Sequence, residues 1–298
     1  NYLNGKFNGI QSYWNSNGNK VEEKNYINGK QQGLWTLYYQ ETGIKKEETN
    51  YIDGVQEGLW TEWYEDGQKR RERNFKNGER DSTWTTWYKN GNKKFLASYS
   101  DGKLNGKYIR WYEGGIIKEL DGEYLNNKKH KKWIYWSKNG QKTEEINYDN
   151  GVHHGSHIKW FGEKSDQHKK FHINYKNGDK DGNWRHWYSS GVDSLKATYL
   201  NGEKDGHWIW WRKNGLKDKE GFYKKEKKHG LWTIWNDSTG SAYHKLHEET
   251  YVNDAIDGKV TKWYKEGGLD RQGIMRGKEK EGEWTYWERG GKRWLKFD

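Results

Sequence analysis

The sequence predicts an all-β protein built from about twelve tandem β-hairpin repeats, and three observations lead to this prediction. An aromatic residue returns at intervals of 24 or 25 residues, two turn-forming dipeptides fall between successive aromatics, and the segments between turns are short. A unit of about 24 residues cannot bury a core alone, so it must stack on its neighbours. We therefore expect an elongated, twisted antiparallel sheet, a β-hairpin solenoid, occupying residues 1–298 as a single repeat array.

The order of residues within each repeat supports two strands per period. The closing aromatic is followed by a turn, a Gly, the pattern Trp-x-x-Trp-Tyr, a second turn and a charged segment, as in residues 58–75. Two short segments and two turns per period are typical of a hairpin repeat. Two intervals, 148–175 and 223–251, are longer than the rest. The repeats begin near Tyr2, Tyr26, Tyr51, Phe75, Tyr99, Tyr124, Tyr148, Tyr175, Tyr199, Tyr223, Tyr251 and Met275.

The turn dipeptides also predict how the strands pair. Asn-Gly and Asp-Gly supply the positive φ angles that a two-residue hairpin turn requires. With residues 66–67 as such a turn, Tyr64 faces Lys69 and Gly58 faces Phe75. Counting outward in the same way from the corresponding turns places a Gly opposite an aromatic in other repeats. The pairs are Gly9 and Tyr26, Gly182 and Tyr199, and Gly206 and Tyr223. We expect each of these rings to lie over the bare glycine backbone.

The two tryptophans of a repeat are three residues apart, so strand alternation places them on opposite faces of the sheet. The first Trp column, for example Trp60, shares its face with the closing aromatic and with the Tyr four residues later, such as Tyr64. We expect this face, which we call the first-Trp face, to be the buried side.

The second Trp column is the candidate binding surface, because eleven of twelve repeats carry Trp there. If this column faces solvent, its rings recur at roughly 10 Å intervals, two strand spacings apart, and form an apolar stripe of the kind that marks partner sites. Tight coiling of the sheet, a second layer, or covering Lys and Arg stems would bury it instead. The candidate residues are Trp63, Trp87, Trp111, Trp136, Trp160, Trp187, Trp211, Trp235, Trp263 and Trp287.

The two longer intervals insert polar residues into the array. Loops on a rigid scaffold often carry specificity, although both segments also fit tolerated insertions without a role. The candidate loop residues are Lys164, Asp166, His168, Tyr243 and His244.

No motif in the sequence predicts catalysis. Histidines gather between residues 153 and 172, and they would suit a metal if strand and loop converged. However, His157 occupies the first Trp column, and His154 precedes a Gly at the same position of its repeat as His229 does. Both observations favour structural roles. Nucleophile motifs, phosphate loops and dinucleotide fingerprints are absent from the sequence. We therefore predict a non-enzymatic protein without a metal or cofactor.

The composition fits an aromatic repeat. A hydrophobic content of 31% with 33% charged residues would suggest disorder, but the aromatic content of 17% argues against it. The net charge is +11, and acids recur three residues before the closing aromatic, as at Glu72, among Lys and Arg. We expect these charges to pair across strands. Any positive charge that stays unpaired would attract anionic lipid, acidic protein or nucleic acid.

Two further features bear on location. No apolar run approaches the roughly 20 residues that a membrane-spanning helix needs. The sequence begins at Asn1, inside a repeat and without Met, which indicates that a leading segment was removed or lies outside the given sequence, and we favour the cell envelope or an extracellular location.

The repeat pattern resembles a known family. Tyr-x-Asn-Gly-x-x-x-Gly-x-Trp-x-x-Trp/Tyr-Tyr-x-x-Gly-x-Lys, at 26–45, 51–69 and 75–93, resembles the MORN-repeat variant of the YwqK-type antitoxin family. The resemblance implies stacked hairpins, a scaffolding or membrane-proximal role, and, from the family name, sequestration of a toxin. This sequence departs from the pattern at Ser82 and Lys131, which replace Gly, and at Lys225-Glu226, which replaces Asn-Gly.

Short aromatic hairpin repeats also resemble the cell-wall-binding repeats of choline-binding and glucan-binding proteins, in which rings of adjacent hairpins form sites. Trp and Tyr faces stack well on sugar rings and on quaternary ammonium groups. We therefore predict a scaffold that binds a protein partner along its aromatic and basic surface, with antitoxin-like sequestration as one form. Glycan binding is the alternative, attachment to anionic lipid is third, and nucleic acid is the least favoured partner.

Overall fold

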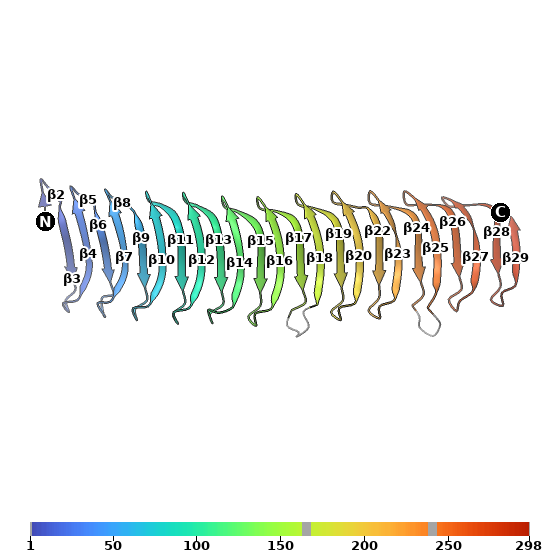
Figure 1. Ribbon diagram of the computed structural model, residues 1–298, viewed down its shortest axis with the longest axis horizontal. Helices are drawn as coiled ribbons and strands as arrows, with labels where there is room; N and C mark the ends of the chain where they lie inside the picture. Colours follow the sequence, from blue (N-terminus) through green and yellow to red (C-terminus); the bar gives the residue numbers. More distant parts are fainter. Residues whose placement is uncertain (1, 163–167, 238–242, 298) are drawn as a thin grey trace. The chain divides into compact units, whose positions relative to one another are not determined.

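The computed structural model describes residues 2–162, 168–237 and 243–297, and this part of the chain consists of β-strands, turns and loops (Figure 1). The strands pair antiparallel with their neighbours in chain order, which confirms the predicted all-β hairpin-repeat fold. No described residue belongs to a helix long and apolar enough to cross a membrane. The chain divides into two compact units, the first comprising 1–143 and 147–152 and the second comprising 144–146 and 153–298.

The first unit contains fifteen complete strands. They are β1 (Tyr2–Leu3), β2 (Lys6–Phe7), β3 (Gly9–Trp14), β4 (Lys20–Ile27), β5 (Lys30–Gln31), β6 (Gly33–Tyr38), β7 (Lys45–Ile52), β8 (Val55–Gln56), β9 (Gly58–Trp63), β10 (Lys69–Lys76), β11 (Glu79–Trp87), β12 (Lys93–Ser100), β13 (Lys103–Trp111), β14 (Lys118–Leu125) and β15 (Lys128–Trp136). Strands β16 (Lys142–Asp149) and β17 (Val152–Trp160) contain residues of both units.

The second unit continues the same alternation. Its complete strands are β18 (Lys169–Lys176), β19 (Asp179–Trp187), β20 (Asp193–Leu200), β21 (Glu203–Lys204), β22 (Gly206–Trp211), β23 (Lys217–Lys224), β24 (Lys227–Trp235), β25 (Lys245–Val252), β26 (Ala255–Trp263), β27 (Leu269–Arg276), β28 (Glu279–Trp287) and β29 (Arg293–Phe297).

The turns that join one repeat to the next are two-residue turns, as predicted. At 53–54 both residues have positive φ, 49° for Asp53 and 87° for Gly54, and Ile52 pairs with Val55. These are the angles of a type I′ turn, which matches the twist of the flanking strands. The N–H of Gly54 also donates to the carbonyl of Gln31 in the preceding repeat, at 2.9 Å. Each such turn therefore joins neighbouring repeats as well as reversing the chain.

The turn inside each repeat differs from the prediction. Only Gly67 of the 66–67 pair has positive φ, 84°. Tyr64 accepts a bond from the N–H of Gly67 at 2.9 Å and donates its own N–H to Gln68 at 2.8 Å. This is a three-residue loop closed by a left-handed glycine, so β10 carries a bulge and Lys69 pairs with Trp63. The predicted pairing of Tyr64 with Lys69 is wrong, because the loop contains one more residue than a two-residue turn.

Beyond the bulge the predicted register is confirmed. Gly58 pairs with Phe75, and the same pairing recurs at Gly9 with Tyr26, Gly182 with Tyr199, and Gly206 with Tyr223. The expected role of the glycine is wrong, however. Gly58 has a φ of 78°, and a Cβ built on it would meet no atom within 4 Å. Backbone conformation, and not a covering ring, is what requires glycine here.

Rings do cover glycine at a different slot. A Cβ on Gly122 would lie 2.3 Å from Trp133, and Gly221 and Gly273 stand in the same relation to the tryptophans eleven residues later. This slot lies two residues before the closing aromatic, and Ala97 occupies it in another repeat. The small residue leaves room for an indole to lie flat on the strand beside it.

The first-Trp face forms the core, as predicted. Trp84 lies 5.5 Å from Phe75 and 4.8 Å from Tyr99, measured between ring centroids, and Trp133 is 2% exposed. The indole N–H of Trp84 donates to the carbonyl of Asn74 at 3.1 Å. The same bond is made by Trp35, Trp133, Trp208, Trp232 and Trp284. Each of these indoles thereby satisfies its only polar group while it packs against the aromatics of adjacent strands.

Candidate functional site

The second Trp column lies at the strand ends. In the first unit Trp63, Trp87, Trp111 and Trp136 are the last residues of β9, β11, β13 and β15. In the second unit Trp160, Trp187, Trp211, Trp235, Trp263 and Trp287 end β17, β19, β22, β24, β26 and β28. All are half-buried except Trp235, which is 9% exposed. The column is therefore neither a fully open stripe nor a packed core.

Cations partly cover these rings, in line with the alternative that Lys and Arg side chains would cover the second Trp column. The ammonium of Lys196 lies 5.1 Å from the ring centre of Trp211, and that of Lys217 lies 5.3 Å from Trp235. In both cases the lysine belongs to the preceding repeat. Such contacts are favourable because the ring face is electron-rich, and they give the column a mixed aromatic and basic surface.

The acid column pairs mainly along its own strand. Lys118 contacts Asp121 at 2.5 Å and Lys217 contacts Glu220 at 3.0 Å. Residues three apart normally point to opposite faces, but the bulge at the start of each of these strands brings them to the same face. The expectation of cross-strand pairing is wrong for this column, although Arg185 and Asp193 do pair across strands at 2.7 Å.

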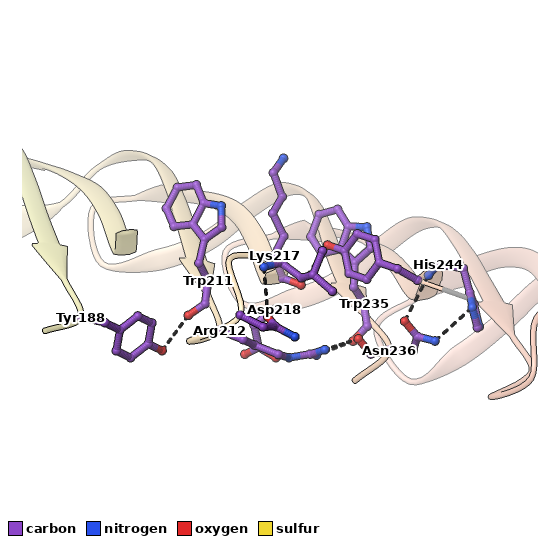
Figure 2. Close-up of polar contacts among 11 residues, drawn as sticks. Tyr188, Trp211, Arg212, Lys217, Asp218, Trp235, Asn236 and His244 are labelled. Carbon is purple, nitrogen blue, oxygen red and sulfur yellow. Dashed lines mark hydrogen bonds and ion pairs between the residues drawn. The ribbon is translucent and has the colours of Figure 1, made fainter. Parts of the chain in front are cut away.

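A ladder of tyrosine hydroxyls joins successive repeats, and sequence reasoning did not find it. Tyr88 donates to the backbone carbonyl of Trp111 at 2.8 Å, and Tyr188 donates to that of Trp211 at 2.8 Å (Figure 2). The residues that make this bond are Tyr39, Tyr64, Tyr88, Tyr112, Tyr188 and Tyr264. Burial raises the pKa of Tyr88 and Tyr112. The available signal was the recurrence of Tyr directly after the second Trp.

Arg212 replaces tyrosine at this slot and makes the equivalent contact. Its Nη2 donates to the carbonyl of Trp235 at 2.8 Å and to Asp218 at 2.8 Å (Figure 2). The guanidinium is thus fixed by a carboxylate while it reaches the next repeat. The connection between repeats is conserved in geometry although the side chain differs.

The described residues of the second insertion pack against Trp235 of the second Trp column. Tyr243 stacks on Trp235 with ring centres 6.4 Å apart and an interplanar angle of 11°, and its hydroxyl donates to the carbonyl of Lys217 at 2.9 Å. The backbone N–H of His244 donates to Asn236 at 3.1 Å (Figure 2). Asn236 is 1% exposed. Tyr243 and His244 therefore hold the strand ends together.

In the first insertion His168 also lies against the scaffold, because its Nδ1 is 3.1 Å from the carbonyl oxygen of Ser189. Lys164 and Asp166 lie outside the described residues.

The histidines near residue 157 belong to the packed faces. The His157 ring lies 4.9 Å from Phe171 and its Nε2 is 2.8 Å from Glu144, a bond that lowers the pKa of this carboxyl. On the other face His172 is 2.8 Å from the hydroxyl of Ser156, and burial lowers the pKa of His172. The described residues contain no group of three or more His, Asp or Glu side chains arranged to hold a metal ion.

Comparison with known proteins supports the repeat class. Residues 56–77 and 129–150 match the family model described as MORN repeat variant. Repeats of this kind are generally associated with scaffolds that bind proteins or membranes. No curated protein sequence matches the chain.

One similar solved structure is titled "Crystal Structure of TcdB2-TccC3-Cdc42". The alignment has 12% identity and a TM-score of 0.20, and it covers 97% of this chain and 16% of that chain. A likeness at this TM-score carries no argument about function.

Proposed function

We propose that this protein is a non-enzymatic MORN-like scaffold that binds a protein partner along the second Trp column. The observation that carries the proposal is the half-buried column of tryptophans with lysine ammonium groups over the rings, as at Lys196 and Trp211. Rigid aromatic rings offer a large contact area at low entropic cost, and half-buried rings can still lose exposed surface to a partner. The repeats provide many similar contacts in a row, which suits an extended partner.

The finer proposal is sequestration of a toxic partner, which the resemblance to the YwqK-type family suggests. An extended scaffold can inhibit by covering a large surface and needs no catalytic group. Its test is co-expression of a captured partner with and without this chain. Growth inhibition by the partner alone, relieved by the chain, supports sequestration; a partner that is harmless by itself contradicts it.

Affinity capture with matched variants tests the protein-binding proposal. The wild-type chain and a Trp63→Ala/Trp136→Ala variant are immobilised and exposed to extract from the native source, and the retained material is identified by mass spectrometry. Ile116, which is 91% exposed and outside the column, supplies the control Ile116→Ala. We expect a protein that is retained at moderate salt by the wild type and by the control but not by the double variant.

Each alternative partner has its own outcome. A wall polysaccharide that quenches tryptophan fluorescence, with no protein retained, would replace the proposal by glycan binding. Retention on anionic vesicles that disappears as salt rises would replace it by lipid attachment, because screening weakens exposed charge contacts. Circular dichroism of the double variant shows whether the sheet is intact.

A further inference from the structure

A cleft of about 450 Å³ opens in the first unit among the repeats of strands β9 to β14. It overlaps the second Trp column at Trp87 and Trp111, but Phe95 in its wall packs on Tyr108, at 5.0 Å, on the first-Trp face. Its lining is aromatic and strongly basic and includes Arg70, Arg71, Lys94, Phe95, Arg110 and Trp111.

The cleft is particular to this place in the array. Arg71 pairs with Thr86, Thr86 with Phe95, and Phe95 with Arg110, so these side chains form one row across four strands. The slot of Arg71 is occupied by acids in the two preceding repeats, Glu22 and Glu47. Basic residues return at this slot in later repeats as Lys219 and Arg271, but they pair with Ile234 and Tyr286 and not with a small Thr.

The charges of the cleft are unbalanced. Arg70 and Arg71 share one carboxylate, Glu62, at 2.7 and 3.0 Å. Lys94 lies 5.2 Å over the ring of Tyr88, and no described carboxylate forms an ion pair with it. A further cation, Arg73, lies on the first-Trp face, where its guanidinium is 4.8 Å from the ring centre of Trp84.

The single acid that lines the cleft is already engaged. Glu119 is held by Arg110 at 2.8 Å. Burial, followed by the charge of Arg71, lowers the pKa of Arg73, which is consistent with crowded cations. The cleft therefore presents excess positive charge beside aromatic walls.

The chemistry of the cleft indicates its ligand. Glu62 shows that one carboxylate fits between two of these guanidinium groups, each oxygen bonded to a different arginine. The volume exceeds that of a lone carboxylate, and Phe95 and Trp111 offer apolar contact beside the cations. We propose that this cleft binds an acidic protein segment in which Asp or Glu side chains alternate with aromatic or aliphatic ones. The carboxylates contact Lys94 and the arginines, and the apolar side chains pack on the rings.

This inference rests on the proposed function in taking a protein as the partner, and of the second Trp column only Trp87 and Trp111 line the cleft. The two can therefore fail separately. Loss of capture in the Trp63→Ala/Trp136→Ala variant concerns column residues outside the cleft, whereas the test below uses a defined peptide and a single lysine of the cleft.

Fluorescence anisotropy with the full chain tests the cleft. The probe is a fluorescein-labelled peptide of alternating Glu and Phe, and its twin carries Gln in place of Glu. Lys94→Gln removes the unpaired cation and should weaken binding of the acidic peptide about fivefold, while Lys94→Glu should weaken it further. Lys46→Gln is the matched control, because Lys46 holds the same slot two repeats earlier, 5.8 Å over Tyr39 and outside the cleft.

The proposal requires tighter binding of the acidic peptide than of its Gln twin, and a larger loss in Lys94→Gln than in Lys46→Gln. Equal affinity for the two peptides, or equal losses in the two variants, overturns it. Binding of phosphatidylserine vesicles that depends on Lys94, without binding of the peptide, also overturns it and assigns the cleft to a lipid headgroup. Far-ultraviolet circular dichroism confirms that each variant is folded.

Discussion

Replacing Gly122 with Ala should destabilise the first unit through one defined contact. Carbon atoms in van der Waals contact are about 3.5–4.0 Å apart, whereas the new Cβ would lie 2.3 Å from Cδ2 of Trp133. The indole must therefore retreat by more than about 1 Å. Trp133 is only 2% exposed and donates its indole N–H to Glu123, so it has little room to move. Overpacking of this kind costs about 2 kcal/mol.

The neighbouring repeat supplies a compensating partner. There Ala97, fully buried, stands in the slot of Gly122, and Tyr108 stands in the slot of Trp133. A smaller ring thus accompanies the larger backbone residue. The substitution Gly122→Ala should therefore cost about 1 kcal/mol less in a Trp133→Tyr background than in the wild type, a coupling typical of side chains in contact.

Hydrogen exchange measured by mass spectrometry on the full chain suits this test, because repeat arrays need not unfold in one step. A loss of about 2 kcal/mol corresponds to roughly 30-fold faster exchange of the amides of β14 and β15. Peptides from the second unit serve as internal reference. Unchanged exchange in Gly122→Ala, or an equal cost in both backgrounds, would refute the steric argument.

Three further predictions concern strain, the hydroxyl ladder and pH. Ser82 and Lys131 have φ of 55° and 58°, in the left-handed region where other repeats carry Gly. Ser82→Gly and Lys131→Gly should therefore each raise the free energy of unfolding by about 1 kcal/mol, measured as a higher urea midpoint. The control Lys131→Ala should not raise it. Tyr88→Phe removes the hydrogen bond to the carbonyl of Trp111 and should lower local stability by about 1 kcal/mol. The measurement is hydrogen exchange, which should become faster for the amides at the end of β13. The control Tyr38→Phe should show no such change, because the Tyr38 hydroxyl makes no ladder bond. Burial lowers the pKa of His172, His186 and His247 in the folded chain. Below pH about 6.5 the unfolded chain therefore binds more protons than the folded chain. The free energy of unfolding should accordingly fall as the pH drops from 7 to 5. His186→Phe should reduce this slope in urea titrations, and an unchanged slope contradicts the assignment.

Much of the local structure could be predicted from the sequence. The pairing of Gly58 with Phe75, the two-residue turn at 53–54 and the burial of the first Trp column all follow from turn chemistry and strand alternation. These features depend on residues within about one repeat of each other, so a single copy contains the information. The recurrence of the same signals across the chain made the fold class readable.

The candidate sites were less predictable, because they depend on contacts between repeats. Whether Trp211 is open or covered depends on Lys196 in the preceding repeat, and the donation of Tyr88 to Trp111 spans two repeats. The basic cleft around Arg71 and Arg110 arises only when four strands align in register. No single repeat contains these arrangements.

The sequence by itself determined the hairpin, its register beyond the turn and the existence of two aromatic columns, because backbone alternation and turn residues act over a few positions. Only the tertiary structure decided which glycine lies under an indole, that β10 bulges between Lys69 and Arg71, and where cations outnumber carboxylates. The physical reason is distance along the chain. Sterics and charge act between side chains that stacking brings within a few ångströms, although they belong to different repeats.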